Sequence, residues 1–409
     1  MPFGKGNRFL SAWPRKQAAK VFAGTGLAPG VEIQMKPRPD DKWRFVDLTQ
    51  ERVNRHASRQ PYRLLAGLTI SSDFSTVQAA LVAASGRGHF LTIRHIEFVE
   101  HKLPENLTFE MSRLCESPHI HFEDMRAIAL DFTGHVALAA ESLKCRAGRY
   151  VDRILAVTFL EPWEAESALL QFSANAFLPH RLAELTGLNV IDRIPESDRA
   201  AGGKGFPLAG YPMWLLLADR HSSVARGPTA AILIDRDCDL YWLPSSDGLD
   251  TSPPAIQWRR IHNVWNSAID PPKDSTIQRT LLQDIPQLLA EWQRTDRQPI
   301  VHVLVVGPSS IVDVVRSEIV KSTMIETTDA SFDPFTQIDF PNQGSRAYVA
   351  AILGALLIDQ VPSNLPDLTG ATGYRLLGQV TPGKPARWRE LVTAMSDHSP
   401  LPLKLRDAI

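Results

Sequence analysis

The chain has 409 residues, of which 44% are apolar and 22% charged, and its formal net charge is -1. This composition is typical of an ordinary globular protein, and the length exceeds what one hydrophobic core usually supports, so we expect two domains. Three cysteines, Cys115, Cys145 and Cys238, are too few and too far apart for a disulfide framework, which favours a reducing, cytoplasmic compartment.

The N-terminal segment is the first predicted element, and it is basic. Residues 1–63 carry 13 Lys and Arg against 5 Asp and Glu, whereas the rest of the chain carries 31 against 40. Such an arm is either a poorly ordered extension or a contact for nucleic acid or an anionic membrane surface. Because its basic residues are dispersed, we interpret residues 1–62 as a flexible extension and expect no nucleic-acid partner.

The first globular lobe is predicted over residues 63–205. Its opening stretch, 63–86, predicts two strands joined by a polar turn, because an apolar run is followed by alternation of apolar and polar residues. A short buried strand is predicted at 153–161. The predicted helices, with apolar spacing close to 3.6, cover 106–116, 124–146 and 164–186. Strands that alternate with helices indicate an α/β architecture.

The second lobe is predicted over residues 206–409. The apolar patterns predict a hairpin at 229–244 and a central strand at 299–307. The predicted helices cover 211–221, 276–295 with a kink at Pro286, and 348–358. That last run is far shorter than the roughly 20 residues that cross a bilayer, so we expect a buried helix and no membrane span. The tail from 362 onward predicts a structured cap, and no internal sequence repeat is evident.

A glycine-rich loop, Gly202-Gly203-Lys204-Gly205, follows two acidic residues, Asp192 and Asp198. Exposed N–H groups of such a loop can hold an anion or sugar oxygens. It is not a P-loop, because glycine and not Ser or Thr follows Lys204. Taken alone, it is better interpreted as a tight connection. The two aspartates are either a catalytic base with its orienting partner, or residues that cap helices or turns.

Three stretches taken together resemble the anhydro-N-acetylmuramic acid kinase family, bacterial enzymes that recycle cell-wall sugar. They are AGLTISSDFSTVQAALV (66–82), TGLNVIDRIPESDRAAGGKGFPLAG (186–210) and VPSNLPDLTGATGYRLLGQVTPG (361–383). The resemblance covers about residues 63–390. It implies an α/β protein with the two-lobed actin/hexokinase/Hsp70-like (ribonuclease H-like) fold and an interlobe cleft. It also implies ATP and Mg²⁺ as cofactors, an amino-sugar ligand and a homodimer; we assign no other metal site.

Within that resemblance, the phosphate positions are altered. The family's phosphate hairpin reads like MSGTSLDGID, whereas this chain has TISSDFSTVQ at 69–78, so that side chains replace both glycines. The family's second phosphate turn aligns with residues 233–239, where an aspartate and an arginine replace paired glycines. An aspartate beside a triphosphate is repulsive unless a metal intervenes. The residues at these phosphate positions are Ser71, Ser72, Asp73, Ser75, Thr76, Gln78, Asp235 and Arg236.

The catalytic position is altered as well. In the family one aspartate activates the water that opens the anhydro ring while O6 takes the γ-phosphoryl group. That aspartate aligns with Arg193, and arginine cannot be a general base near neutral pH. Asp192 replaces it only if the backbone slips by one residue, because strand neighbours point to opposite faces. The resemblance assigns the sugar side of the site to Asp198, Gly202, Gly203, Lys204 and Gly205.

Three hypotheses follow from these departures. The leading one is a degenerate pseudokinase of this family, with lost or weak catalysis, that binds a sugar or a partner. The alternative is an active anhydro-N-acetylmuramic acid kinase that uses Asp73 and Asp192 in shifted registers. A third is a hydrolase that reuses the cleft with Asp192, Glu196 and Asp198 as its acids, although the sequence offers no nucleophile and base pair for it.

Overall fold

The computed structural model describes most of the chain from Tyr62 to Ser396. The described ranges are 62–71, 73–116, 122–161, 176–217, 227–234, 238–244, 254–261, 275–296, 300, 302–307, 309–321, 331–332 and 345–396. Of the predicted basic arm, residues 1–62, all but Tyr62 therefore lie outside them. Within the described residues no helix is both long and apolar enough to cross a membrane.

The first sheet has six strands in the spatial order β11-β5-β4-β1-β2-β3. β1 pairs antiparallel with β2 and parallel with β4, and β4 pairs parallel with β5. β2 pairs antiparallel with β3, and β5 pairs antiparallel with β11. The strands are β1 (Arg63–Ile70), β2 (Thr76–Ser85), β3 (Thr92–Lys102), β4 (Ile154–Leu160), β5 (Asn189–Asp192) and β11 (Gln379–Thr381).

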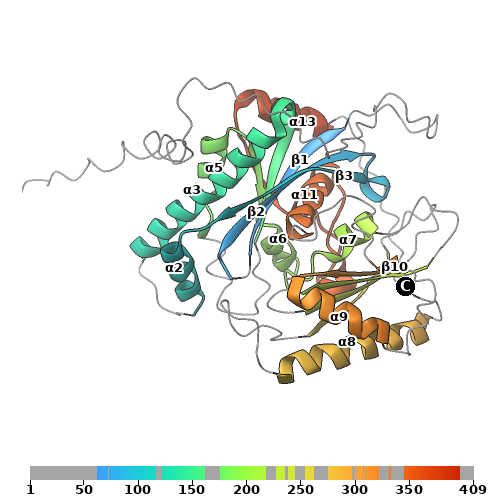
Figure 1. Cartoon of the computed structure of the whole chain (residues 1–409). Coiled ribbons are helices and arrows are strands. Elements are labelled where there is room, and N and C mark those ends of the chain that lie inside the picture. The colour runs from blue at the N-terminus through green and yellow to red at the C-terminus, as the bar shows by residue number, and fades with distance from the viewer. Residues whose placement is uncertain are drawn as a thin grey trace, which may run out of the picture. The chain divides into compact units, whose positions relative to one another are not determined.

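Helices cover both faces of this sheet, which is why its central strands are apolar throughout. One face carries α2 (Glu105–Glu116), α3 (Phe122–Ala147) and α5 (Pro179–Thr186), and the other carries α11 (Ser345–Ile358) and α13 (Pro385–Ser396) (Figure 1). α11 lies directly on β1 at Gly67, where an added Cβ would come within 1.8 Å of the Ala347 carbonyl oxygen. Only glycine allows this close approach of helix to strand.

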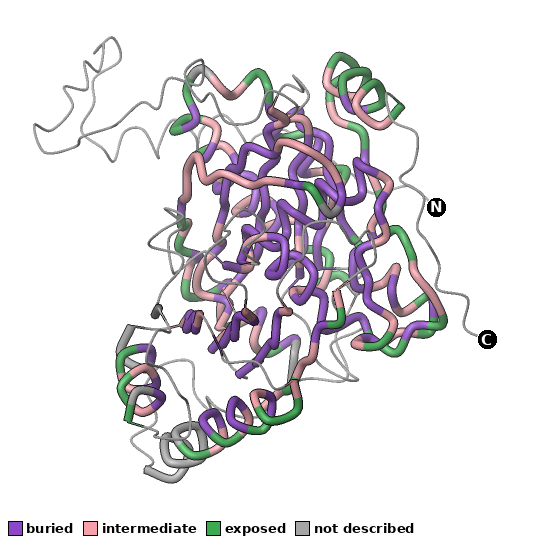
Figure 2. The backbone as a smooth tube through the Cα atoms, turned by 90° about the vertical axis from the view of Figure 1, so that its right-hand side faces the viewer, coloured by how far each residue is buried: buried purple, intermediate pink, exposed green. Residues whose placement is uncertain are grey.

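The second sheet has five strands in the order β10-β9-β6-β7-β8. β6 pairs antiparallel with β7 and parallel with β9, while β7–β8 is antiparallel and β9–β10 parallel. The strands are β6 (Thr229–Ile234), β7 (Cys238–Leu243), β8 (Gln257–Ile261), β9 (His302–Val306) and β10 (Ser331–Phe332). One face packs on α8 (Ser275–Asp296) and α9 (Ser309–Lys321). Over residues 283–296 of α8, each turn buries one side of the helix and exposes the other (Figure 2).

Both sheets share one topology. In each, the first strand of the sheet pairs antiparallel with the second, the second antiparallel with the third, and the first parallel with the fourth, which in turn pairs parallel with the fifth. This doubled α/β unit is the actin/hexokinase-like (ribonuclease H-like) fold, so the predicted fold class is confirmed. The sequence shows no repeat, and the duplication is visible only in strand order.

The predicted boundaries of the two lobes stay a prediction. The structure shows which sheet the C-terminal part of the chain contacts. After the second sheet the chain returns to the first, because α11, α13 and β11 all contact strands of the first sheet. α11 and α7 (Gly210–Leu217) also share one apolar core with strands of both sheets. The cap predicted from 362 onward is thus part of the first sheet's own structure.

Several predicted elements differ from the structure. The predicted helix 164–186 is not continuous, since Phe177 and Leu178 are not helical and Pro179 begins α5; residues 162–175 lie outside the described ranges. Pro favours the first helical turn and disfavours a helical residue before it. The strands β3 and β8 were not predicted, because each lies at a sheet edge and its half-exposed residues show no apolar alternation.

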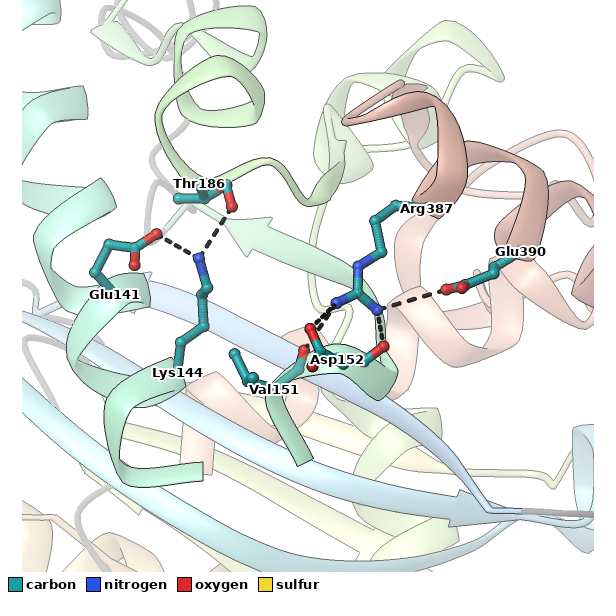
Figure 3. Close-up of polar contacts among 7 residues, drawn as sticks. All are labelled: Glu141, Lys144, Val151, Asp152, Thr186, Arg387 and Glu390. Carbon is teal, nitrogen blue, oxygen red and sulfur yellow. Dashed lines mark hydrogen bonds and ion pairs between the residues drawn. The ribbon is translucent and has the colours of Figure 1, made fainter. Parts of the chain in front are cut away.

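Long polar side chains fasten the helices to one another (Figure 3). Lys144 of α3 donates to the Thr186 carbonyl oxygen at the end of α5 (3.0 Å) and to the Glu141 carboxylate (2.6 Å). Arg387 of α13 donates to the carbonyl oxygens of Val151 and Asp152, in the 3-10 turn before β4. A cation at a helix carboxyl end satisfies carbonyls that have no partner inside the helix. The Lys144 contact fixes Thr186, the first residue of the stretch 186–210 that resembles the kinase family.

A histidine pair joins β3 to α3. His101 Nε2 and His135 Nδ1 are 3.0 Å apart, and the Asp131 carboxylate is 4.0 Å from His135 Nε2. Burial lowers the pKa of both imidazoles below 6.5; the neighbouring His135 lowers the pKa of His101 further, and Asp131 opposes the shift at His135. Both rings are therefore neutral in the folded protein near pH 7.

We predict that stability falls as the pH decreases through 6.5. Well above pH 6.5, both rings are neutral in the folded and in the unfolded chain. As the pH falls through 6.5, the unfolded chain takes up protons first, because its histidines have the higher pKa, and this favours unfolding. The melting temperature should drop between about pH 7.5 and pH 5.5, and less so in His135→Gln. His180→Gln, an exposed position on α5, is the matched control and should keep the full drop. An unchanged pH dependence in His135→Gln contradicts the prediction.

Candidate functional site

The candidate site is built on two segments far apart in the chain, 186–205 and 361–383, which meet at Asp198. Asp198 lies in α6 (Ile194–Ala200) and is fully buried. Its Oδ1 accepts hydrogen bonds from Asn364 Nδ2 (3.1 Å) and Thr369 Oγ1 (3.0 Å), and its Oδ2 accepts one from the Gly205 N–H (2.9 Å). Both carboxylate oxygens of Asp198 are therefore used inside the protein. We infer that it organises the site structurally, since a ligand would have to displace these donors.

Further hydrogen bonds join the same two segments. Asn189 of β5 donates to the carbonyl oxygens of Leu155 and Arg387, and it accepts from the Gly383 N–H. The Gly378 N–H donates to Ser197 Oγ, and β5 pairs with β11. The two motifs that carry the family resemblance thus form one structural unit. Each motif stabilises the other through these contacts, and this explains the presence of both whether or not a ligand binds there.

The glycine loop uses its N–H groups within the protein. Gly202 N donates to the Arg199 carbonyl oxygen, Gly203 N to that of Asp198, and Lys204 N to that of Thr369. Gly205 N donates to the Asp198 carboxylate, as described above. A Cβ at Gly203 would lie 2.1 Å from Asp198 Oδ2, so glycine is required there by close packing. None of these four N–H groups is left to cradle an anion, and the loop is a tight connection.

The turn between β1 and β2, at the predicted phosphate hairpin, is closed by its own side chains. Asp73 Oδ1 accepts hydrogen bonds from Ser71 Oγ (2.5 Å), Ser75 Oγ (2.8 Å) and Ser75 N (3.0 Å). Thr76 N donates to Ser71 Oγ, while Ser71 N and Phe74 N donate to carbonyls of the same turn. The turn therefore presents a carboxylate, and the N–H groups of Ser71, Phe74, Ser75 and Thr76 are used within it, where ATP phosphates need free N–H donors. These residues do not fit the β- and γ-phosphates of ATP.

The other predicted phosphate positions are dispersed or outside the described ranges. Gln78 points across the sheet, where its Nε2 donates to Glu100 Oε1 (3.1 Å). Ser72, Asp235 and Arg236 lie outside the described residues. Thr76 begins β2, and its N–H is part of the turn described above. The described residues contain no group of three or more His, Cys, Asp or Glu side chains that could hold a metal ion.

Asp192 and Arg193 lie at the carboxyl end of β5. Asp192 is the last residue of the strand and is 3% exposed, whereas the Arg193 side chain is 51% exposed. Arg193 adopts a left-handed conformation (φ 55°) and precedes the first residue of α6. The expected alternation of strand neighbours therefore does not apply to this pair, because Arg193 has already left the strand.

The Asp192 carboxyl has the properties of a candidate base. Oδ1 has no hydrogen-bond partner among the residues that the structure describes, and Oδ2 is 3.8 Å from Arg193 Nε. Burial raises the pKa of Asp192 to about 6, Arg193 opposes that rise, and Glu196 adds to it. A buried carboxyl with a raised pKa is a recurrent feature of catalytic acids and bases.

A small pocket is lined by residues of both sheets. Its volume is about 30 Å³, room for about two water molecules. Asp192 is not among the described residues that line it. Those residues are Thr69, Leu160, Glu161, Pro195, Gly205, Leu208, Ala209, Leu233, Asp239, Tyr241, Arg346 and Val349. This volume is too small for a sugar or a nucleotide, whose sites usually measure about 300 Å³ or more.

The sequence did not single out some residues that organise the site. Asn364 and Thr369 lie inside the quoted NLPDLTG stretch and donate to Asp198. A buried aspartate needs hydrogen-bond donors, so an expectation that Asp198 is buried would have suggested them as its partners. Asp239 and Arg260, which form a buried ion pair (2.8 Å) beside the pocket, come from adjacent strands of a sheet whose edge strand the sequence did not predict. No local signal identifies that pair.

Comparisons with known proteins give a distant similarity to one sugar kinase. No family model matches the chain. It is 25% identical over 373 residues to the anhydro-N-acetylmuramic acid kinase of Bordetella avium (strain 197N), a match that spans 79% of this chain and 97% of that protein. The chain is thus distantly similar to this kinase along nearly all of the kinase's length.

Solved structures of similar fold include two proteins with low scores. The PPX-GPPA enzyme of Aquifex aeolicus is 13% identical, with a TM-score of 0.30, over 61% of this chain and 69% of that one. The inorganic polyphosphate/ATP-glucomannokinase of Arthrobacter sp. strain KM is 10% identical, with a TM-score of 0.30, over 71% of this chain and 97% of that one. The fold assignment depends on the doubled strand order and not on these scores.

We predict that Asp198→Asn destabilises the protein by about 3 kcal/mol, because the new amide places a donor against the buried donors of Gly205, Asn364 and Thr369. Urea denaturation measures the loss. The matched control Glu184→Gln, exposed on α5, should change stability by no more than about 0.5 kcal/mol. A loss in Asp198→Asn as small as that of the control refutes the structural role of Asp198.

Proposed function

We propose that this chain is a non-catalytic relative of anhydro-N-acetylmuramic acid kinase, which keeps the sugar-kinase fold as a binding module for an amino sugar and does not transfer phosphoryl groups from ATP. The observation that carries the proposal is the closed turn between β1 and β2. There, the Ser71 and Ser75 hydroxyls and the Ser75 N–H donate to the Asp73 carboxylate, and a phosphate group would need such donors for itself. A carboxylate at that place also repels the phosphates.

Two further observations support the proposal. Arg193 stands at the position that the resemblance gives to the catalytic aspartate, and its guanidinium cannot accept a proton. The glycine loop has its N–H groups engaged by Asp198, Arg199 and Thr369. The amino sugar is proposed from the similarity to the Bordetella avium kinase. The homodimer remains a prediction from the family resemblance.

We predict that ATP with Mg²⁺ leaves the melting temperature unchanged, whereas 1,6-anhydro-N-acetylmuramic acid raises it. A ligand at about 100 times its dissociation constant adds about 2.7 kcal/mol, which shifts the melting temperature by several degrees. The Bordetella avium kinase, assayed in parallel, is the positive control for both ligands. A shift with ATP together with a 6-phosphorylated product detected by mass spectrometry refutes the proposal. No shift with the sugar refutes its sugar-binding part.

A second candidate function is supported by Asp192. Its buried carboxyl has a raised pKa and one oxygen without a hydrogen-bond partner among the described residues, which is what an active kinase in a shifted register would need from a base. Asp73 Oδ1 is held in the turn by three hydrogen bonds, so the second role that this hypothesis gives to Asp73 falls to its other oxygen, Oδ2. This candidate therefore retains a base, and its phosphate-side acid has one oxygen already engaged.

If the chain has residual kinase activity, we predict that it rises with pH through about 6, because Asp192 must lose its proton to act as a base. Asp192→Asn should then reduce the rate by a factor of about 100 or more. Glu196→Gln, on the first turn of α6, is the control; it should leave the rate within a few-fold while lowering the pH midpoint, since Glu196 contributes to the raised pKa. Equal activity in Asp192→Asn removes this candidate.

A further inference from the structure

Phe206 follows the glycine loop and lies against the second sheet. Its ring is 4.9 Å from the Arg260 guanidinium carbon and 6.0 Å from the Trp258 ring, which meets it edge to face at 73°. Arg260 and Trp258 both belong to β8. Phe206 is 5% exposed, so the contact is desolvated, a setting in which a cation held over an aromatic face is attracted more strongly than in water.

The surface that receives Phe206 is held rigidly. Asp239, on the adjacent strand β7, accepts hydrogen bonds from Arg260 Nε and Nη2, each at 2.8 Å, and from Trp258 Nε1 at 3.0 Å. The side chains of Arg260 and Asp239 are 4% and 7% exposed. A bidentate pair with so little exposure fixes the plane of the guanidinium on which the Phe206 ring lies.

The segment 201–209 is therefore fastened at two places. Gly205 is tied to Asp198 in α6, and the next residue, Phe206, is tied to β8. Gly205, Leu208 and Ala209 of this segment line the pocket, and so do Asp239 and Tyr241 of β7. Release of Phe206 would remove one of the two attachments, so that the segment moves away from the second sheet and the hydrogen bonds of residues 201 to 205 open more often.

We propose that segment 201–209 is the gate of the pocket, and that the contact of Phe206 with Arg260 and Trp258 is the latch that keeps it closed. The role of the gate in ligand entry rests on the proposed binding function, whereas the latch itself is a property of the free protein. Closure of this gate explains why the volume of the pocket is only about 30 Å³. It also gives the buried Asp239–Arg260 pair a role beyond pairing β7 with β8.

Amide hydrogen exchange followed by mass spectrometry tests the latch in the full chain without any ligand. The N–H groups of residues 201 to 205 are all hydrogen-bonded, so their exchange reports opening of the segment. We expect Phe206→Leu and Arg260→Lys each to speed exchange in 201–209 by about tenfold or more, and to leave β1 unchanged. Phe177→Leu is the matched control: Phe177 is equally buried and stacks on Phe159 in the core beneath α3 and α5, and its loss should leave 201–209 unchanged.

Unchanged exchange in 201–209 in both latch variants overturns the proposal. So does a rise of similar size in β1, because it would show a general loss of stability. A second arm adds 1,6-anhydro-N-acetylmuramic acid to the natural chain and to Phe206→Leu. Faster association with the variant supports the gate, and equal association rates overturn it. Absence of binding to both, with fast exchange in the variant, refutes the proposed sugar-binding function and leaves the latch established.

Discussion

The buried carboxylate of Asp198 is the constraint on which the candidate site depends. A fully buried carboxylate must have its oxygens satisfied, and here the donors come from the glycine loop and from a segment more than 160 residues further along the chain. Gly203 has to be glycine because Asp198 lies where its Cβ would be. One side chain thus fixes α6, the loop after it and the segment around α12 (Pro366–Thr369) relative to one another.

This constraint explains an otherwise contradictory pattern in the sequence. The motifs at 186–210 and 361–383 keep the family's residues, while the phosphate and base positions do not. Because the two motifs hold each other through Asp198, Asn189 and the β5–β11 pairing, they are needed for folding whether or not ATP is used. The turn of the phosphate hairpin is stabilised differently: by the local hydrogen bonds of Asp73, and by Leu103 N and Thr108 Oγ1, which donate to carbonyl oxygens of the turn.

The same unit connects the two sheets. Gly205 is the point at which the Asp198 network ends, and Phe206 is the point at which contact with β8 begins. α7 follows directly and enters an apolar core that strands of both sheets share through α11. The pocket is therefore lined by a short segment with tight attachments on either side, and in the gate proposed above its size depends on whether Phe206 stays in place.

The fold class and most of the strands and helices in the cores of the two sheets could be predicted from the amino-acid sequence, whereas the altered phosphate and base positions remain predictions from the resemblance. These follow from apolar periodicity and from motif order, which are local properties of the chain. Edge strands such as β8 were missed, since half-exposed residues lack alternation. The environment of each acidic residue depends on tertiary contacts. Asp192 and Asp198 are six residues apart and alike in sequence, yet Asp192 is buried with one oxygen that has no hydrogen-bond partner in the described part of the chain, whereas Asp198 has both oxygens satisfied. The reason is physical: the state of a buried carboxyl depends on donors brought to it from distant segments, and a single sequence does not show which donors arrive.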